Sequence, residues 1–191
     1  YTVFVSDATN LVANDTNGVR DVFIFDNQTL QDRRISLSAQ GVQSNGASAN
    51  PAISGNGRFV AFASDATNLV LGDTNGFTDI FVVDALTGVI ARESLSSAGV
   101  QANGSSFRPS ISQDGRYLAF ESTATNLSPL VSTPGTQIYL RDRQTGTTTL
   151  VSQSSSGAAG NGVSVQASVS ADGRYVAFAS DANNLVAGDT N

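Results

Sequence analysis

The sequence has no histidine, cysteine, methionine or lysine among its 191 residues. Without histidine or cysteine it cannot build a Ser-His-Asp or Cys-His catalytic centre, a thiolate metal site or a disulfide. Glutamate occurs only at Glu93 and Glu121, and no pair of carboxylates for glycoside chemistry is evident. We therefore expect a protein that is not an enzyme. Because a complete translation product begins with methionine, we also expect a processed chain or a piece of a longer one.

Positive charge is also scarce. The formal net charge is −6, and all ten basic residues are arginines that stand singly apart from Arg33 and Arg34. No basic stripe is available to neutralise phosphates, so we expect neither nucleic acid nor an anionic membrane surface as a partner. No apolar run has the length of a transmembrane helix, so we expect no membrane insertion. A hydrophobic content of 40% with 14% charged residues is typical of a globular protein.

An internal repeat organises the whole chain. The segment Gly-Arg-Phe-Val-Ala-Phe-Ala-Ser at residues 57–64 returns in closely similar form at residues 115–122 and 173–180. The interval is 58 residues in both cases, from Gly57 to Gly115 and from Gly115 to Gly173. Residues 1–17 and 175–191 belong to the same stretch of the unit. A period of this length indicates a solenoid, a propeller or another repeat array.

Each unit has the pattern of four β-strands. Gly-Asn-Gly, Gln-Asp-Gly and Ala-Asp-Gly tripeptides predict a tight hairpin between the first two strands. The second and third strands carry apolar residues on both faces, which is typical of strands that are covered on both sides. No stretch has the 3.6-residue periodicity of a helix. The first two strands of a unit are expected at 110–112 and 116–122 in the unit that begins at residue 109. The third and fourth strands are expected at 79–84 and 89–96 in the preceding unit, with a turn at 85–88 between them and a Gly/Asn-rich connector at 98–104 after them.

These features predict an all-β fold, a β-propeller segment of four-stranded antiparallel blades, in which neighbouring blades cover one another. A linear β-solenoid is the competing architecture. About three and a third blades cannot close a ring of the usual four to eight, so we expect the segment to be part of a larger ring, completed by more of the same chain or by another copy. The expected divisions are a partial blade at 1–50, blades at 51–108 and 109–166, and a partial blade at 167–191.

The motif at residues 109–122, Pro-Ser-Ile-Ser-Gln-Asp-Gly-Arg-Tyr-Leu-Ala-Phe-Glu-Ser, is followed by Ile-Tyr-Leu-Arg-Asp-Arg-Gln-Thr-Gly at 138–146. This combination resembles the blade of TolB-type propellers, also called the WD40-like or PD40 repeat. The units here are longer than blades of that family, and the excess lies in the loop after the second strand and in the connector. The resemblance implies a bacterial, exported protein, located outside the cell, on its surface or in the periplasm. It implies no catalytic activity, because propeller function resides in loops.

The loop after the second strand contains Asp-x-Asn-Gly-x-x-Asp, a pattern of oxygen ligands with a glycine that permits a sharp turn. Such a loop is suited to a hard cation, and it resembles a shortened form of the Asp-rich calcium loops of FG-GAP propellers. We therefore expect Ca²⁺ to bind weakly here. The pattern is complete in two units and begins again where the chain stops, so the candidate metal ligands are Asp15, Asn17, Asp21, Asp73, Asn75, Asp79, Asp189 and Asn191.

The third unit lacks this pattern. The 58-residue offset places Val131, Thr133 and Gln137 at the positions of the ligands. The joint loss indicates that the oxygen-bearing residues act as a set, and an ion should accordingly occupy the first two units and not the third. Asp-x-Asn-Gly is also a turn that satisfies its own backbone, so a purely structural turn remains open, as does a loop that contacts another protein.

Other recurring residues have structural interpretations. Asp26, Asp84 and Asp142 close the third strand and are expected to accept turn amides, and an arginine beside each hairpin (Arg58, Arg116 and Arg174) is expected to pair with such a strand-end aspartate. The aromatic residues Phe4, Phe62, Phe120 and Phe178 are expected to lie in the core between blades.

Three roles remain open on the sequence. The leading hypothesis is a non-catalytic scaffold that binds a protein or cell-envelope partner, or further copies of itself, and is stabilised by calcium. The second is the accessory propeller of a larger hydrolase of the prolyl-oligopeptidase type. The third is a repeat unit of an extracellular fibre or surface layer. A downstream Gly-x-Ser-x-Gly motif would favour the second, and dozens of 58-residue units would favour the third.

Overall fold

The computed structural model describes residues 1–132 and 134–189, which form thirteen β-strands and no helix. The strands form four antiparallel sheets in chain order, which we call blades 1 to 4. Blade 1 contains β1 (Thr2–Ser6), β2 (Asp21–Asp26) and β3 (Gln31–Arg34). Blade 2 contains β4 (Ser48–Ile53), β5 (Phe59–Ser64), β6 (Asp79–Asp84) and β7 (Ile90–Arg92). Blade 3 contains β8 (Ser106–Ile111), β9 (Tyr117–Ser122), β10 (Gln137–Asp142) and β11 (Thr147–Leu150), and blade 4 contains β12 (Ser164–Val169) and β13 (Val176–Ser180).

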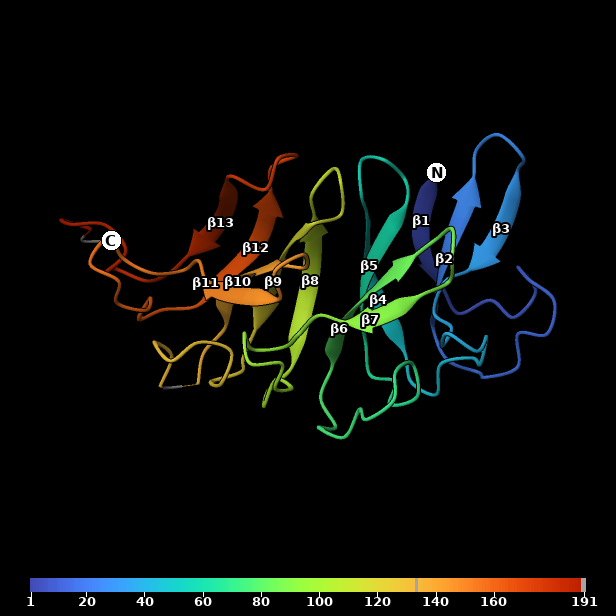
Figure 1. Ribbon diagram of the computed structural model, residues 1–191, viewed down its shortest axis with the longest axis horizontal. Coiled ribbons are helices and arrows are strands. Elements are labelled where there is room, and N and C mark those ends of the chain that lie inside the picture. The colour runs from blue at the N-terminus through green and yellow to red at the C-terminus, as the bar shows by residue number, and fades with distance from the viewer. Residues whose placement is uncertain (133, 190–191) are drawn as a thin grey trace.

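The blades stand side by side, and the two chain ends lie at opposite ends of the row (Figure 1). The β4–β5, β8–β9 and β12–β13 hairpins point to one side of the row, and the long β1–β2, β5–β6 and β9–β10 loops point to the other (Figure 1). The four-stranded antiparallel sheets confirm the predicted all-β fold of propeller blades. In the described part of the chain, no helix is long and apolar enough to cross a membrane.

Apolar side chains fill both junctions between the first three blades. Between blades 1 and 2, Phe62 and Phe81 are fully buried together with Val22 and Ile24 of β2. Between blades 2 and 3, Phe120 and Tyr139 pack against the opposite face of blade 2. A strand such as β5 therefore contributes alternate residues to two cores, which explains its apolar residues on both faces. The predicted core positions of Phe62 and Phe120 are confirmed, because both side chains have 0% exposure.

The first strand of a blade begins earlier than the sequence pattern indicates. β4 starts at Ser48 and β8 at Ser106, whereas the expected blades start at Pro51 and Pro109. Each of these strands contains a register shift, between Ala49 and Ala52 in β4 and at the equivalent place in β8 and β12. A proline has no N–H to donate to a ladder, and an interruption of the ladder accommodates it. The proline therefore lies inside the strand, at the interruption, and does not mark its start.

Candidate functional site

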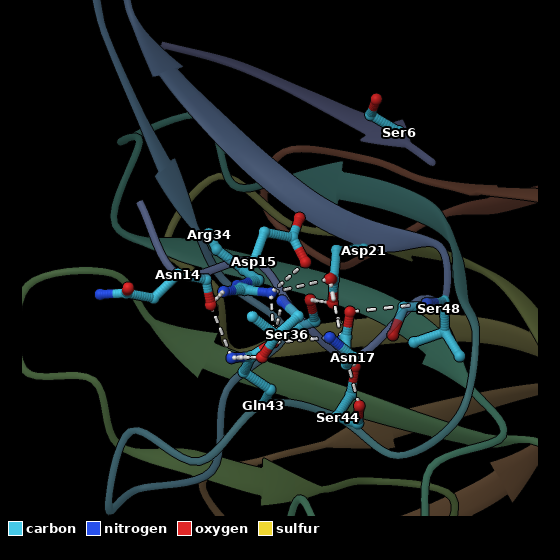
Figure 2. Close-up of polar contacts among 12 residues, drawn as sticks. Ser6, Asn14, Asp15, Asn17, Asp21, Arg34, Ser36, Gln43, Ser44 and Ser48 are labelled. Carbon is cyan, nitrogen blue, oxygen red and sulfur yellow. Dashed lines mark hydrogen bonds and ion pairs between the residues drawn. The ribbon is translucent and has the colours of Figure 1, made fainter. Parts of the chain in front are cut away.

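The predicted oxygen ligands of the first loop come together, but around an arginine (Figure 2). Arg34, from the end of β3, places Nη1 3.0 Å from a carboxylate oxygen of Asp15, 3.0 Å from one of Asp21 and 3.0 Å from Oε1 of Gln43. These charged side chains are almost completely buried, with exposed fractions of 6% for Arg34, 4% for Asp15 and 1% for Asp21. We call Asp15, Asn17, Asp21, Arg34 and Gln43 the first ion cluster.

The second loop repeats this arrangement. Nη1 of Arg92, at the end of β7, lies 2.9 Å from Asp73, 3.4 Å from Asp79 and 3.0 Å from Oε1 of Gln101. Burial raises the pKa of Asp73, because the charged carboxylate loses hydration in this environment. We call Asp73, Asn75, Asp79, Arg92 and Gln101 the second ion cluster. Each cluster combines two carboxylates with one guanidinium.

The asparagine of each loop supports the cluster with its nitrogen. Nδ2 of Asn17 donates to Asp21 at 3.0 Å and to the carbonyl of Ser44 at 3.1 Å. Nδ2 of Asn75 likewise donates to Asp79 at 2.9 Å and to the carbonyl of Ala102 at 3.1 Å. The side-chain oxygens of both asparagines face turn amides. Each asparagine therefore presents a donor, and not an oxygen ligand, to its neighbouring carboxylate.

These contacts fit a guanidinium and do not fit a calcium ion. Calcium needs six to eight oxygen atoms at 2.3–2.6 Å, whereas these oxygens surround a nitrogen at hydrogen-bonding distances of 2.9 to 3.4 Å. In residues 1–132 and 134–189, no group of three or more His, Cys, Asp or Glu side chains could hold a metal ion. A divalent ion would have to displace a buried arginine. Calcium binding stays a prediction. The chain itself places a cation, the guanidinium of Arg34 or Arg92, where the calcium ion was expected.

Blade 3 shows what replaces the cluster. Leu150 stands at the position of Arg92, Val131 at that of Asp73 and Ala159 at that of Gln101, and Leu150 and Val131 are buried. Gln137 takes the place of Asp79. Its Oε1 accepts a hydrogen bond from Ser152, as Asp79 does from Ser94, and its Nε2 donates to the carbonyl of Gly160 at 3.0 Å. The neutral amide of Gln137 thus accepts a hydrogen bond as Asp79 does and donates one to a backbone carbonyl as Asn75 does.

The last two predicted ligands lie at the end of the chain. Asp189 is described, and Asn191 lies outside the described residues. The structure therefore does not place the third copy of the loop.

Sequence reasoning missed Arg34, Arg92, Gln43 and Gln101. A signal was present, because both arginines and both glutamines recur at 58 residues and are lost together with the aspartates in the third unit. In each of the first two units, the aspartates and the asparagine therefore recur together with an arginine and a glutamine, and the arginine is the cation of the cluster.

The strand-end pairs are confirmed where both members are described. Arg58 contacts Asp84 at 2.7 Å, and Arg116 contacts Asp142 at 2.7 Å. The hydrogen bonds from Arg58 lower the pKa of Asp84 to about 2. The aspartates also accept turn amides as predicted, from Gln28 for Asp26, from Leu86 for Asp84 and from Gln144 for Asp142. The arginine–aspartate pairs thus stabilise the hairpin side of blades 2 and 3.

Calcium is expected to leave the melting temperature of the chain unchanged. The arginine already neutralises part of the negative charge of the two carboxylates in each cluster. A weakly bound calcium ion at millimolar concentration cannot displace a buried guanidinium that is held by both carboxylates. The measurement is thermal unfolding by circular dichroism in 5 mM CaCl₂ and in 5 mM EDTA, with MgCl₂ as the ionic control. A stabilisation by calcium alone that disappears in Asp73→Asn would restore the metal hypothesis.

Solved structures of known proteins support the fold. Neither protein-family models nor curated proteins give a match to this sequence. Among solved structures, TolB from Acinetobacter baumannii is similar with a TM-score of 0.53 and 20% identity, over 85% of this chain and 32% of TolB. The tricorn protease gives a TM-score of 0.53 and 16% identity, over 86% of this chain and 13% of the protease. A prolyl endopeptidase gives 0.51 and 16%, over 85% of this chain and 23% of that enzyme.

This chain thus spans about a third of TolB and less of the two peptidases. At these identities the likeness concerns the fold. The antiparallel blades, the hairpin glycines and the structural matches lead to one conclusion. The chain has the fold of a TolB-like β-propeller, of which it forms an open segment of four consecutive sheets.

Proposed function

We propose that the chain is part of a non-catalytic, exported propeller that binds a protein or cell-envelope partner. One observation carries the proposal. The charged side chains that are buried in the described part of the chain have ion-pair partners; these residues are Asp15, Asp21, Arg34, Asp73, Asp79, Asp84, Arg92, Glu93, Glu121 and Arg141.

Catalytic acids and bases characteristically lie in a cleft and have a strongly perturbed pKa, whereas structural ion-pair networks bury charge without such a cleft. Here the buried charges connect strands and blades. Glu93 of blade 2, for example, accepts from Arg141 at 3.3 Å and from Arg143 at 2.8 Å, both in blade 3. These groups stabilise a rigid frame, and a rigid frame with exposed loops and strand edges is suited to binding.

A second candidate function is that of an accessory propeller in a larger hydrolase. The tricorn protease and a prolyl endopeptidase match the fold about as well as TolB does. In that case the catalytic residues would lie in a separate domain of the same protein. The third role, as a unit of an extracellular fibre or surface layer, rests on the repeat alone.

Affinity capture followed by rebinding tests the proposal. The purified chain is immobilised and exposed to an envelope fraction of a bacterium that encodes such 58-residue units, and each captured protein is purified and titrated calorimetrically. We expect a partner that rebinds with a dissociation constant of about 10 μM or lower, near −7 kcal/mol. The chain alone is expected to turn over none of a panel of chromogenic esters and peptides. Sustained turnover, or the absence of any protein that rebinds, would contradict the proposal.

A further inference from the structure

The first strand of blades 2, 3 and 4 contains a residue with an unusual backbone. Asn50, Arg108 and Gln166 have φ values of 51°, 45° and 59°, in the left-handed region. They are spaced by 58 residues and lie at the register shifts of β4, β8 and β12. A left-handed conformation costs a residue with a side chain about 1–2 kcal/mol relative to glycine. The same strained position is thus built three times.

Glycine would remove this strain, and the chain uses glycine freely for the purpose. Twelve glycines of the described residues have a positive φ. At the three strand positions, however, the chain has an asparagine, an arginine and a glutamine. Strained backbone positions cluster at functional sites, and each of these three positions keeps a polar side chain.

The three side chains are exposed, and their polar groups are mostly unused. Within the described part of the chain, the side-chain amides of Asn50 and Gln166 make no hydrogen bond. Arg108 uses only Nη1, which lies 3.4 and 3.5 Å from the two carboxylate oxygens of Glu121. By contrast, the loop amides of Asn17 and Asn75 are engaged in the ion clusters.

Glu121 connects two of the three residues, Arg108 and Gln166. Its side chain is 3% exposed, and Oε1 accepts the backbone N–H of Gln166 at 2.6 Å in addition to its contact with Arg108. Arg108 and Gln166, from neighbouring blades, therefore share one carboxylate. The other copies of this position carry Val5, Ala63 and Ala179. The contact with the buried carboxylate leaves Nε and Nη2 of Arg108 available, and the Arg108 side chain is 55% exposed.

We propose that Asn50, Arg108 and Gln166 form a binding surface for an extended acidic peptide segment of the partner. β4, β8 and β12 are consecutive neighbours, so the three side chains form a row across the blades. Side-chain amides can both donate to and accept from a peptide backbone. The free edge of the guanidinium suits a carboxylate, which can accept two parallel hydrogen bonds from it. The inference deepens the proposed binding function by naming the surface and the ligand class.

The test uses defined peptides and nuclear magnetic resonance. The isotope-labelled chain is titrated with a blocked pentapeptide that has aspartate at its centre and alanine elsewhere, and with matched peptides that have asparagine or lysine at the centre. The aspartate peptide is expected to shift the side-chain amide signals of Asn50 and Gln166 and the Nε signal of Arg108. Binding of the lysine peptide is expected to be at least tenfold weaker. Equal shifts with all three peptides, or none, would overturn the proposal.

Variants separate binding from folding. Asn50→Gly and Gln166→Gly are expected to melt at the same temperature as the parent chain or higher, because glycine adopts a positive φ without strain, and to bind the aspartate peptide several-fold more weakly. Arg108→Gln should lose at least tenfold in affinity. Leu30→Gly is the control, since Leu30 is also left-handed at 56° and is 68% exposed. It should raise the melting temperature or leave it unchanged, with no effect on binding.

A clear drop in melting temperature in Asn50→Gly and Gln166→Gly, with unchanged peptide binding, would show that these side chains serve the fold and would overturn the proposal. Failure of this binding surface can be distinguished from failure of the proposed binding function. If a captured partner rebinds equally well to the parent chain and to Arg108→Gln, the binding function stands and this surface is not its site. If no partner rebinds and no peptide binds, both proposals fail.

Discussion

Replacement of Arg92 by methionine is expected to destabilise the chain by about 3 kcal/mol or more. The substitution leaves Asp73 and Asp79 buried together without a counter-charge, with side chains that are 2% and 0% exposed. Removing one partner of a buried ion pair typically costs about 3–5 kcal/mol, because an uncompensated charge stays in a poorly hydrated environment. Urea unfolding at pH 7, followed by circular dichroism, measures the difference. A fall of less than about 1 kcal/mol would show that the guanidinium does not hold the second ion cluster together.

Blade 3 supplies the matched rescue variant. A quadruple variant that copies it, Asp73→Val, Asp79→Gln, Arg92→Leu and Gln101→Ala, removes both carboxylates together with the arginine. Exchange of a buried ion pair for well-packed apolar residues is often neutral or stabilising. The free energy of unfolding of this variant is therefore expected to lie within about 1–2 kcal/mol of that of the parent chain. If it were as unstable as Arg92→Met, the cluster would be needed for more than charge compensation.

Replacement of Gly115 by alanine is expected to be the second large effect, about 3 kcal/mol. Gly115 has a φ of 78°, and a Cβ atom there would overlap the ring of Phe59 in the preceding blade. Alanine would thus combine a left-handed backbone, about 1–2 kcal/mol, with an overpacked contact, about 1–3 kcal/mol. The same urea unfolding measures the loss. The hairpin glycine is needed both for the turn and for the approach of the neighbouring blade.

Gly99→Ala separates these two contributions. Gly99 has a φ of 77°, but no heavy atom lies within 4 Å of the position that a Cβ atom would take there, so only the backbone contribution of about 1–2 kcal/mol is expected. In a Phe59→Ala background the ring is absent, and Gly115→Ala should then cost no more than Gly99→Ala. Equal losses for Gly115→Ala and Gly99→Ala in the parent chain would show that contact with Phe59 does not limit the residue at position 115.

The repeat made most of the fold predictable. A strand covered on both sides needs apolar residues on both faces, and a two-strand hairpin needs a residue that adopts a positive φ at its turn. Both requirements are local, so β6 was predicted with its observed bounds, Asp79–Asp84. Strand β7 was predicted too long, at 89–96, because the ladder ends at Arg92 where the ion cluster begins. Propensity alone contains no information on where a neighbouring strand ceases to pair.

The role of the Asp-x-Asn-Gly-x-x-Asp loops depended on tertiary structure. By itself, the sequence determined that Asp15, Asn17 and Asp21 recur and disappear as a set. It did not determine that Arg34, which follows Asp15 by nineteen residues, enters the same cluster. The antiparallel register that pairs Phe23 with Arg34 brings the guanidinium to the loop. Oxygen ligands for a metal and oxygen acceptors for an arginine have the same residue types, and only the three-dimensional arrangement distinguishes them.

The row of Asn50, Arg108 and Gln166 likewise required the structure. These residues are unlike one another in sequence, and each lies immediately before the point at which the sequence pattern places the start of a blade. Only the backbone shows that all three adopt the left-handed conformation at a register shift. The sequence alone therefore determined the repeat, the strands and the turns, because these depend on local conformational preferences and on the burial of alternate faces. The tertiary structure decided which polar groups satisfy one another and which remain free to bind, because that depends on strand register and on packing between blades.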